Sequence, residues 1–250
     1  MAHMIVAGNW KMNASKNAVT ELLSGLKHGA VTIKNAELVV FPPFPYLAQA
    51  QAELTGTSIH IGAQNICAAD KGAYTGEVSL TMVKEFGVSY VLVGHSERRA
   101  LYAEDDAQVA AKYVAIQAAQ LTPILCVGET LEQRKQGLTL SVVTGQIQAV
   151  IDAAGGASFA NAVIAYEPVW AIGTGLTASP GEAQEVHRAI RAHIASVALE
   201  QASGLKILYG GSVTATSAEE LFAQADIDGG LVGGASLTAD SFLAIGQAAK

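Results

Sequence analysis

Residues 90–99 read YVLVGHSERR, and this stretch contains the pattern that decides the fold. A short apolar run ends at Val93, and Gly94, His95 and charged residues follow it at once. Similar apolar runs recur along the whole chain and are nearly continuous in hydropathy, which is typical of strands in a parallel sheet buried on both faces. We predict eight such strands, at residues 5–7, 38–41, 59–61, 90–93, 124–127, 162–165, 207–209 and 231–232.

The segments between these strands have apolar residues at helical spacing, so each has one apolar face. Residues 179–182 (SPGE) and 217–220 (SAEE) are both interpreted as capping boxes, with Ser179 and Ser217 as the N-caps. No linker or change of composition divides the chain, so we predict one domain over residues 1–250 built from eight βα units. Eight units form a closed (β/α)8 barrel, eight parallel strands surrounded by helices, or an open doubly wound sheet. We expect residues 1–4 to be a cloning remnant or a disordered start.

The composition excludes several classes of protein. Half of the 250 residues are apolar and only 15% are charged, which indicates a globular protein. The net charge of −7 argues against nucleic-acid binding. The longest stretches without a charge, such as residues 54–69, are too short and too polar to span a membrane. No secretory signal is evident, so we expect a cytosolic chain. Cys67 and Cys126 have no metal-site or disulfide spacing, and we interpret them as buried thiols.

Polar residues and glycine pairs stand just beyond the predicted strands. In a barrel the carboxyl ends of all strands meet at one face, where barrel enzymes have their active sites. We therefore expect these residues to converge on one cavity: Asn9, Lys11, Gln64, Asn65, His95, Ser96, Glu97, Glu129, Glu167, Gly210, Gly211, Ser212, Gly233 and Gly234.

Four kinds of chemistry are represented in this set. The turns at 210–212 and 233–234 have the placement of a barrel phosphate site. Glu167 precedes Pro168, whose stiff backbone aims the carboxylate, and is a candidate general base. His95 stands where a helix begins, which lowers the pKa of an imidazole and keeps it neutral. Lys11 is placed to neutralise a phosphate or an oxyanion.

Other motifs carry less weight. Residues 173–178 (GTGLTA) imitate a dinucleotide fingerprint, but the loop after Glu167 is too long for one, and we interpret residues 168–178 as a mobile lid. No GxSxG nucleophile elbow is present. The remaining histidines have no partner in the sequence pattern and are interpreted as structural: His28, His60, His187 and His193.

Five of these segments together resemble the triosephosphate isomerase family, in order and over essentially the full length: 8–13 (GNWKMN), 94–99 (GHSERR), 166–175 (YEPVWAIGTG), 209–213 (YGGSV) and 231–237 (LVGGASL). The resemblance implies a TIM barrel that interconverts dihydroxyacetone phosphate and glyceraldehyde 3-phosphate through an enediolate, in glycolysis and gluconeogenesis. It implies Glu167 as the base, neutral His95 as the electrophile, and Lys11 with Asn9 as the positive groups.

The resemblance also implies partners and supporting residues. The phosphate would be held by Gly173, Ser212, Gly233 and Gly234, with Glu97 and Ser96 supporting the site. No cofactor and no metal are required, because the hydrogen moves as a proton. The loop after Gln64 and Asn65 resembles one that inserts Thr75 into a second subunit, so a homodimer is expected. Leu176 stands where many relatives carry lysine, which affects lid kinetics and not the reaction.

Two alternatives are kept. An aldolase would use Lys11 as a Schiff-base nucleophile, and borohydride trapping would reveal its covalent adduct. A catalytically silent barrel could act as a binding or scaffold protein, although it would have no need to keep Lys11, His95 and Glu167 together.

Overall fold

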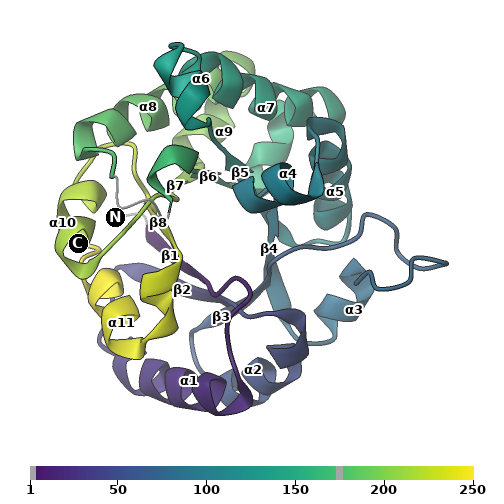
Figure 1. Ribbon diagram of the computed structural model, residues 1–250, viewed down its shortest axis with the longest axis vertical. Helices are drawn as coiled ribbons and strands as arrows, with labels where there is room; N and C mark the ends of the chain where they lie inside the picture. The colour runs from purple at the N-terminus through teal and green to yellow at the C-terminus, as the bar shows by residue number, and fades with distance from the viewer. Residues whose placement is uncertain (1–3, 173–176) are drawn as a thin grey trace.

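A computed structural model describes residues 4–172 and 177–250. Its strands form one closed parallel barrel in sequential order, because β1 pairs with β8 as well as with β2 (Figure 1). The predicted barrel is confirmed and the open sheet is wrong. The strands are β1 (Met4–Asn9), β2 (Ala36–Phe41), β3 (His60–Ala63), β4 (Val88–Val93), β5 (Thr122–Val127), β6 (Val163–Tyr166), β7 (Lys206–Tyr209) and β8 (Gly229–Val232).

Helices surround the barrel on the outside (Figure 1). The α-helices are α1 (Lys16–Ala30), α2 (Leu47–Leu54), α3 (Leu80–Lys84), α4 (Ser96–Tyr102), α5 (Asp106–Ala118), α6 (Leu131–Lys135), α7 (Thr139–Ala154), α8 (Pro180–Val197), α9 (Leu199–Gly204), α10 (Ala215–Phe222) and α11 (Ala239–Gln247). Short 3-10 turns are η1 (Phe44–Tyr46), η2 (Gly156–Asn161), η3 (Val169–Ala171) and η4 (Gly234–Leu237).

The core has two parts, because each strand is buried on both faces. One set of side chains fills the inside of the barrel, among them Phe41, Leu92 and Leu208. A larger set packs between the barrel and the helices, for example Val40 against the apolar face that contains Leu23. This double burial explains why the strands read as continuous apolar runs.

The two expected capping boxes have different outcomes. Ser179 caps α8 and its hydroxyl accepts from the N–H of Glu182, as predicted. The N-cap of α10 is Thr214 and not Ser217, which occupies the third helical position and whose hydroxyl oxygen accepts from the N–H of Thr214. The prediction was wrong because either residue can accept from the helix start, and Thr214 is the one with extended backbone.

The amino end of the chain also differs from expectation. Met4 was grouped with a remnant, yet it is the first residue of β1, pairs with Ala36 and donates its N–H to the carbonyl of Asn35. Residues 1–3 lie outside the described residues. The two cysteines are free thiols; Cys126 is buried inside the barrel and Cys67 is half-buried.

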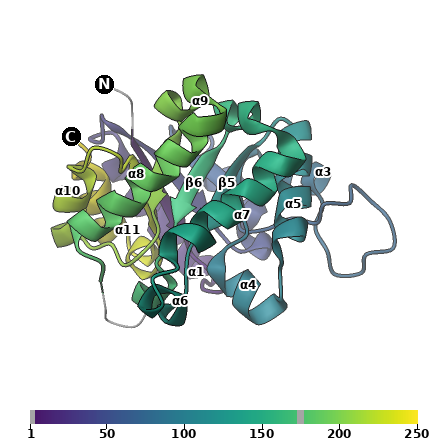
Figure 2. The same ribbon diagram turned by 90° about the horizontal axis from the view of Figure 1, so that it is seen from above.

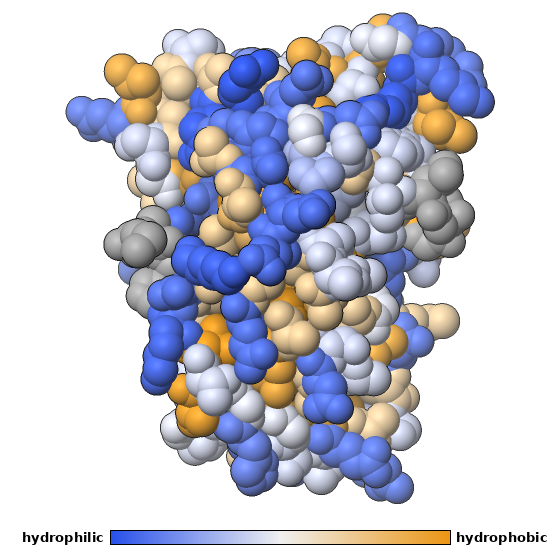
Figure 3. Space-filling view, turned by 90° about the vertical axis from the view of Figure 1, so that its left-hand side faces the viewer, coloured by the Kyte–Doolittle hydropathy of each residue, from blue (hydrophilic) through white to orange (hydrophobic). Residues whose placement is uncertain are grey.

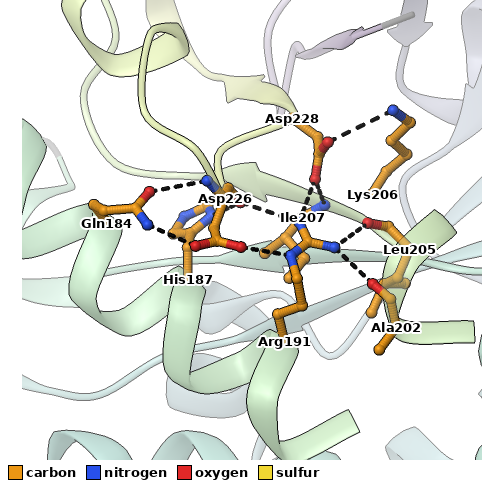
Figure 4. Close-up of polar contacts among 9 residues, drawn as sticks. All are labelled: Gln184, His187, Arg191, Ala202, Leu205, Lys206, Ile207, Asp226 and Asp228. Carbon is orange, nitrogen blue, oxygen red and sulfur yellow. Dashed lines mark hydrogen bonds and ion pairs between the residues drawn. The ribbon is translucent and has the colours of Figure 1, made fainter. Parts of the chain in front are cut away.

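A polar cluster fastens α8 to the amino ends of β7 and β8 (Figure 4). The guanidinium of Arg191 contacts Asp226 at 2.6 Å and Asp228 at 2.8 Å, and it donates to two backbone carbonyls of the α9 region. Beside it, His187 is fully buried against the carbonyl of Asp226, and burial lowers its pKa to about 4. The ring of His187 also packs against those of Tyr166 and Tyr209, and His187 does not line the cavity at the carboxyl ends of the strands, which fits its interpretation as a structural residue.

The outer surface has a polar face over some of the helices, and one loop projects from it. On the side where α8 and α10 lie, hydrophilic residues run across the surface with small apolar groups between them (Figure 3). The connection from β3 to α3 projects away from the barrel in both ribbon views (Figures 1 and 2), and residues 70–77 in it are exposed.

Over the described residues, no helix combines the length and the hydropathy that crossing a membrane requires.

Candidate active site

A cavity of about 400 Å³ opens at the carboxyl ends of the strands. It brings together the predicted catalytic and phosphate-binding candidates that the structure describes, namely Asn9, Lys11, His95, Glu167, Ser212, Gly233 and Gly234. They come from five strands that are far apart in the sequence. Gly173 lies outside the described residues, as do Leu176 and the predicted tip of the lid.

Glu167 follows β6 directly and is only 2% exposed. Its Oε1 lies 2.9 Å from His95 Nε2, and its Oε2 accepts from the backbone N–H of Ser96 at 2.9 Å. Burial by itself raises the pKa of this carboxyl, but His95, the Ser96 N–H and Lys11 favour the carboxylate and the pKa is lowered overall. The group is therefore an ionised, largely desolvated carboxylate, which is the form a general base needs.

His95 is the N-cap of α4, and its ring is buried. Nδ1 lies 3.2 Å from the backbone N–H of Glu97 and accepts from it. The ring proton is then on Nε2, which faces Glu167, so this geometry fits a neutral imidazole. Burial lowers the pKa of His95, yet the carboxylates of Glu167 and Glu97 outweigh it and the pKa is raised overall. The expected lowering was wrong, because the sequence gives no sign of a carboxylate 2.9 Å away.

Lys11 is held in an unusual backbone conformation beside His95. Its φ of 54° lies in the left-handed region, which costs a non-glycine residue on the order of 1–3 kcal/mol. The side chain of Asn9 accepts from the N–H of Lys11 at 3.0 Å, and Gln64 donates to the carbonyl of Lys11 at 2.9 Å. The ammonium pairs with Glu97 at 2.6 Å. Asn9 and Gln64 thus fix the strained residue that carries the positive charge.

The glycine turns line the same cavity, and Gly233 lies next to the side chain of Lys11. Gly233 is the N-cap of the short η4 and Gly234 is its first residue, and Ser212 donates its hydroxyl to the carbonyl of Ala171. Gly210 also has a steric role that the sequence pattern does not predict. A Cβ on this residue would lie 2.9 Å from Cγ of Glu167, so the glycine makes room for the carboxylate side chain.

Similarity to known proteins agrees with this geometry. A family model described as Triosephosphate isomerase matches residues 4–249. The chain belongs to the triosephosphate isomerase family. Proteins named "Triosephosphate isomerase" are 58% identical over 246 residues in Alcanivorax borkumensis (98% of each chain), 56% over 250 residues in Dechloromonas aromatica (100% of each) and 58% over 249 residues in Thiobacillus denitrificans (100% of this chain, 99% of the relative).

The supporting residues implied by the resemblance to triosephosphate isomerases lie where support is needed. Glu97 contacts Lys11 and lies 3.6 Å from Nδ1 of His95, and Ser96 donates to Glu167. Asn65 accepts from Lys112 within the same chain, while Thr75 is exposed in the projecting loop. Gln64 was expected at a subunit interface, and its amide in fact also bonds to the backbone of Lys11.

The sequence pattern does not predict the packing behind the candidate base. Glu129 was noted only as a polar residue after β5; it is fully buried and accepts from Trp170 Nε1 at 2.9 Å and from the hydroxyl of Tyr166 at 3.1 Å. Gly128, the residue before it, touches the backbone of Glu167. A lone acidic residue in a loop carries no signal for such a contact.

Proposed function

We propose that this protein interconverts dihydroxyacetone phosphate and D-glyceraldehyde 3-phosphate by proton transfer through an enediolate, an aldose–ketose isomerisation used in glycolysis and gluconeogenesis. The observation that carries the proposal is the 2.9 Å contact between a buried carboxylate, Glu167, and His95 Nε2 in a cavity that also contains Lys11. A base and a hydrogen-bond donor this close can act on two neighbouring atoms of one small substrate.

The reaction needs two proton movements that balance. The carboxylate of Glu167 takes a proton from the carbon next to the carbonyl, and the electron pair of that C–H bond moves to form the enediolate. Nε2–H of His95 donates to the oxygen that becomes negative, and His95 then carries a proton between the two oxygens. Glu167 returns its proton to the neighbouring carbon, which forms the isomer. In the described geometry the Nε2 of His95 faces Glu167. The substrate oxygen therefore replaces the carboxylate as the acceptor of the hydrogen bond from Nε2–H.

Positive charge and phosphate binding are supplied by different residues of the same cavity. Lys11, oriented by Asn9, offers positive potential to the enediolate and the phosphate. Backbone N–H groups around Ser212, Gly233 and Gly234, with Gly173, would hold the phosphate, which leaves the reacting carbons between Glu167 and His95. Glu97 and Ser96 support Lys11 and Glu167 from behind.

Isomerisation in deuterium oxide tests the proton-transfer step. The base exchanges with solvent, so deuterium should appear on the substrate carbons at a rate comparable to turnover. Complete retention of the substrate hydrogen, as in a hydride shift, would contradict the mechanism. Treatment with borohydride in the presence of substrate checks the aldolase alternative. A covalent adduct on Lys11 would favour the aldolase, whereas the ion pair of Lys11 with Glu97 supports a purely electrostatic role.

We also propose a homodimer formed through the projecting loop. A second cavity of about 380 Å³ beside the active site is lined by Met12, Gln64, Leu101 and Tyr102, and it reaches Lys11, His95 and Glu97. Met12 is 97% exposed, Leu101 73% and Tyr102 67%, which is unusual for a surface that stays in water. The loop of residues 70–77, which includes Thr75, is exposed and projects away from the barrel in both ribbon views, and we propose that it enters this cavity on a second copy. Sedimentation of the purified protein at the mass of one chain would contradict the dimer.

The proposed compartment is the cytoplasm. Both cysteines are free thiols, which suits a reducing environment, and the two triose phosphates are intermediates of cytoplasmic sugar metabolism. Cell fractionation, with antibodies to detect the protein, tests this proposal. Recovery of the protein outside the cytoplasmic fraction would contradict it.

A further inference from the structure

Gln146, on the inner side of α7, holds the backbone that lies behind Glu167. Its side-chain amide makes two hydrogen bonds to a single residue: Oε1 accepts from the N–H of Gly128 at 2.8 Å, and Nε2 donates to the carbonyl of Gly128 at 3.2 Å. A primary amide accepts through its oxygen and donates through its nitrogen at the same time. A carboxylate of the same length could not donate, and an apolar side chain could do neither.

The place of this contact in the barrel explains what it does. The pairing of β4 with β5 ends at Leu125, three residues before Gly128, so no strand backbone satisfies Gly128 on that side. On the other side the chain after β5 continues alongside the chain after β6, because Glu167 donates its N–H to Val127 at 2.7 Å. Gln146 therefore supplies the hydrogen bonds that a neighbouring strand supplies elsewhere.

Gly128 transmits its position directly to Glu167. A Cβ on Gly128 would lie only 1.7 Å from the carbonyl oxygen of Glu167, so the two backbones are in contact. The next residue, Glu129, accepts a hydrogen bond from the indole of Trp170. Gly128 and Glu129 therefore connect Glu167 to the segment that follows Glu167 in the chain. A shift of Gly128 would move the backbone that carries the catalytic carboxylate, and misplacement by about 1 Å can cost on the order of 10²-fold in rate.

We propose that Gln146 is a positioning residue for the isomerase reaction, which holds Glu167 in register with His95 through Gly128. The inference rests on the proposed function, since it assigns to Glu167 the role of the base. Gln146 itself does not line the substrate cavity. Its loss should therefore lower kcat while the affinity for inorganic phosphate stays the same.

The surroundings of Gln146 allow a direct test by chemical rescue. Gln146, Gly128 and Glu167 border a separate cavity of about 290 Å³, so truncation of the side chain leaves space that a small amide can enter. Formamide can accept and donate as the glutamine does, whereas N,N-dimethylformamide can only accept. Gln148 on the same helix is a matched control, because within the described residues its amide bonds to Asp152 alone, at the surface.

The experiment compares Gln146→Ala, Gln146→Met and Gln148→Ala with the wild-type protein. We expect kcat to fall about tenfold in both Gln146 variants, with the inhibition constant of inorganic phosphate changed less than twofold, and Gln148→Ala to match the wild type. Formamide should restore the Gln146→Ala rate several-fold and dimethylformamide should not. Gln146→Met keeps the length and packing, so it decides the matter if the alanine variant does not fold.

A second readout separates this inference from the proposed function. The ¹⁵N chemical shift of His95 Nε2 reports its hydrogen bond to Glu167 without any turnover. We expect this shift to change in Gln146→Met and in Gln146→Ala, and to return in the alanine variant with formamide. A wild-type protein without isomerase activity would refute the proposed function, and the shift would still decide the role of Gln146. Unchanged kcat and shift, or a loss of kcat that formamide leaves untouched, would overturn the inference.

Discussion

Replacing Gly210 with alanine tests how closely the position of the base controls the rate. The new Cβ would lie 2.9 Å from Cγ of Glu167 and 3.1 Å from the carbonyl oxygen of Tyr166. Because carbon atoms pack at about 3.5–4 Å, the side chain of Glu167 has to move by roughly 0.6–1 Å. A displacement of about 1 Å costs on the order of 10²-fold, so we expect kcat of Gly210→Ala to fall between about 10-fold and 10²-fold.

The assay measures kcat and the inhibition constant of inorganic phosphate in parallel. The Cβ points at Glu167, so phosphate affinity should change little. Gly145→Ala is the control, because a Cβ there meets nothing within 4 Å and lies within α7. That variant should keep its kcat and gain about 0.5–1 kcal/mol in the free energy of unfolding. A Gly210→Ala enzyme with unaltered kcat, or one that loses phosphate affinity instead, would refute the steric argument.

Four further changes probe other parts of the structure. Glu167→Asp retracts the carboxylate by one methylene and should lower kcat on the order of 10²-fold or more at unchanged phosphate affinity; wild-type turnover would remove the base assignment. Thr75→Arg should give weakly active monomers by placing a charge in the proposed interface, and an unchanged sedimentation coefficient would argue against that interface. Arg191→Met removes the guanidinium from Asp226 and Asp228, of which Asp228 keeps the longer contact with Lys206, and should lower the free energy of unfolding by about 3 kcal/mol in urea titrations, an effect absent if the cluster is fully solvated. The pKa of His187 is about 4 in the folded protein and 6.5 in the unfolded chain, so the unfolded state binds more protons as the pH falls from 6.5 to 4. The free energy of unfolding should therefore fall by about 3 kcal/mol over that pH range in the wild type but not in His187→Gln.

Local patterns were enough to predict the barrel and several of the residues that lie at the carboxyl ends of its strands. Each strand is marked by its own apolar run, and each candidate residue follows its strand within a few positions, so the rule that carboxyl ends meet at one face brings them together. Asn9, His95 and Glu167 do line one cavity. The Ser179 cap could also be predicted from neighbouring residues alone. Near α10, by contrast, Thr214 and Ser217 could each begin a helix, and only the folded structure selects Thr214.

Contacts across the barrel could not be predicted in the same way. The direction of the His95 pKa depends on a carboxylate from another βα unit, and the need for glycine at position 210 depends on the same side chain. Gln146 is one of several glutamines on helices, and its partner Gly128 is set by how the barrel closes. These features depend on distances between elements, which a single sequence does not contain.

The rate at which the purified protein converts glyceraldehyde 3-phosphate to dihydroxyacetone phosphate tests the central claim most directly. The assay couples the product to a dehydrogenase, in the presence of a chelator and beside an enzyme-free control. The account predicts a kcat/KM near the diffusional ceiling of roughly 10⁸ M⁻¹s⁻¹. A folded protein that leaves glyceraldehyde 3-phosphate unchanged would contradict it, and would leave a barrel of this family that acts as a binding protein or on another phosphate.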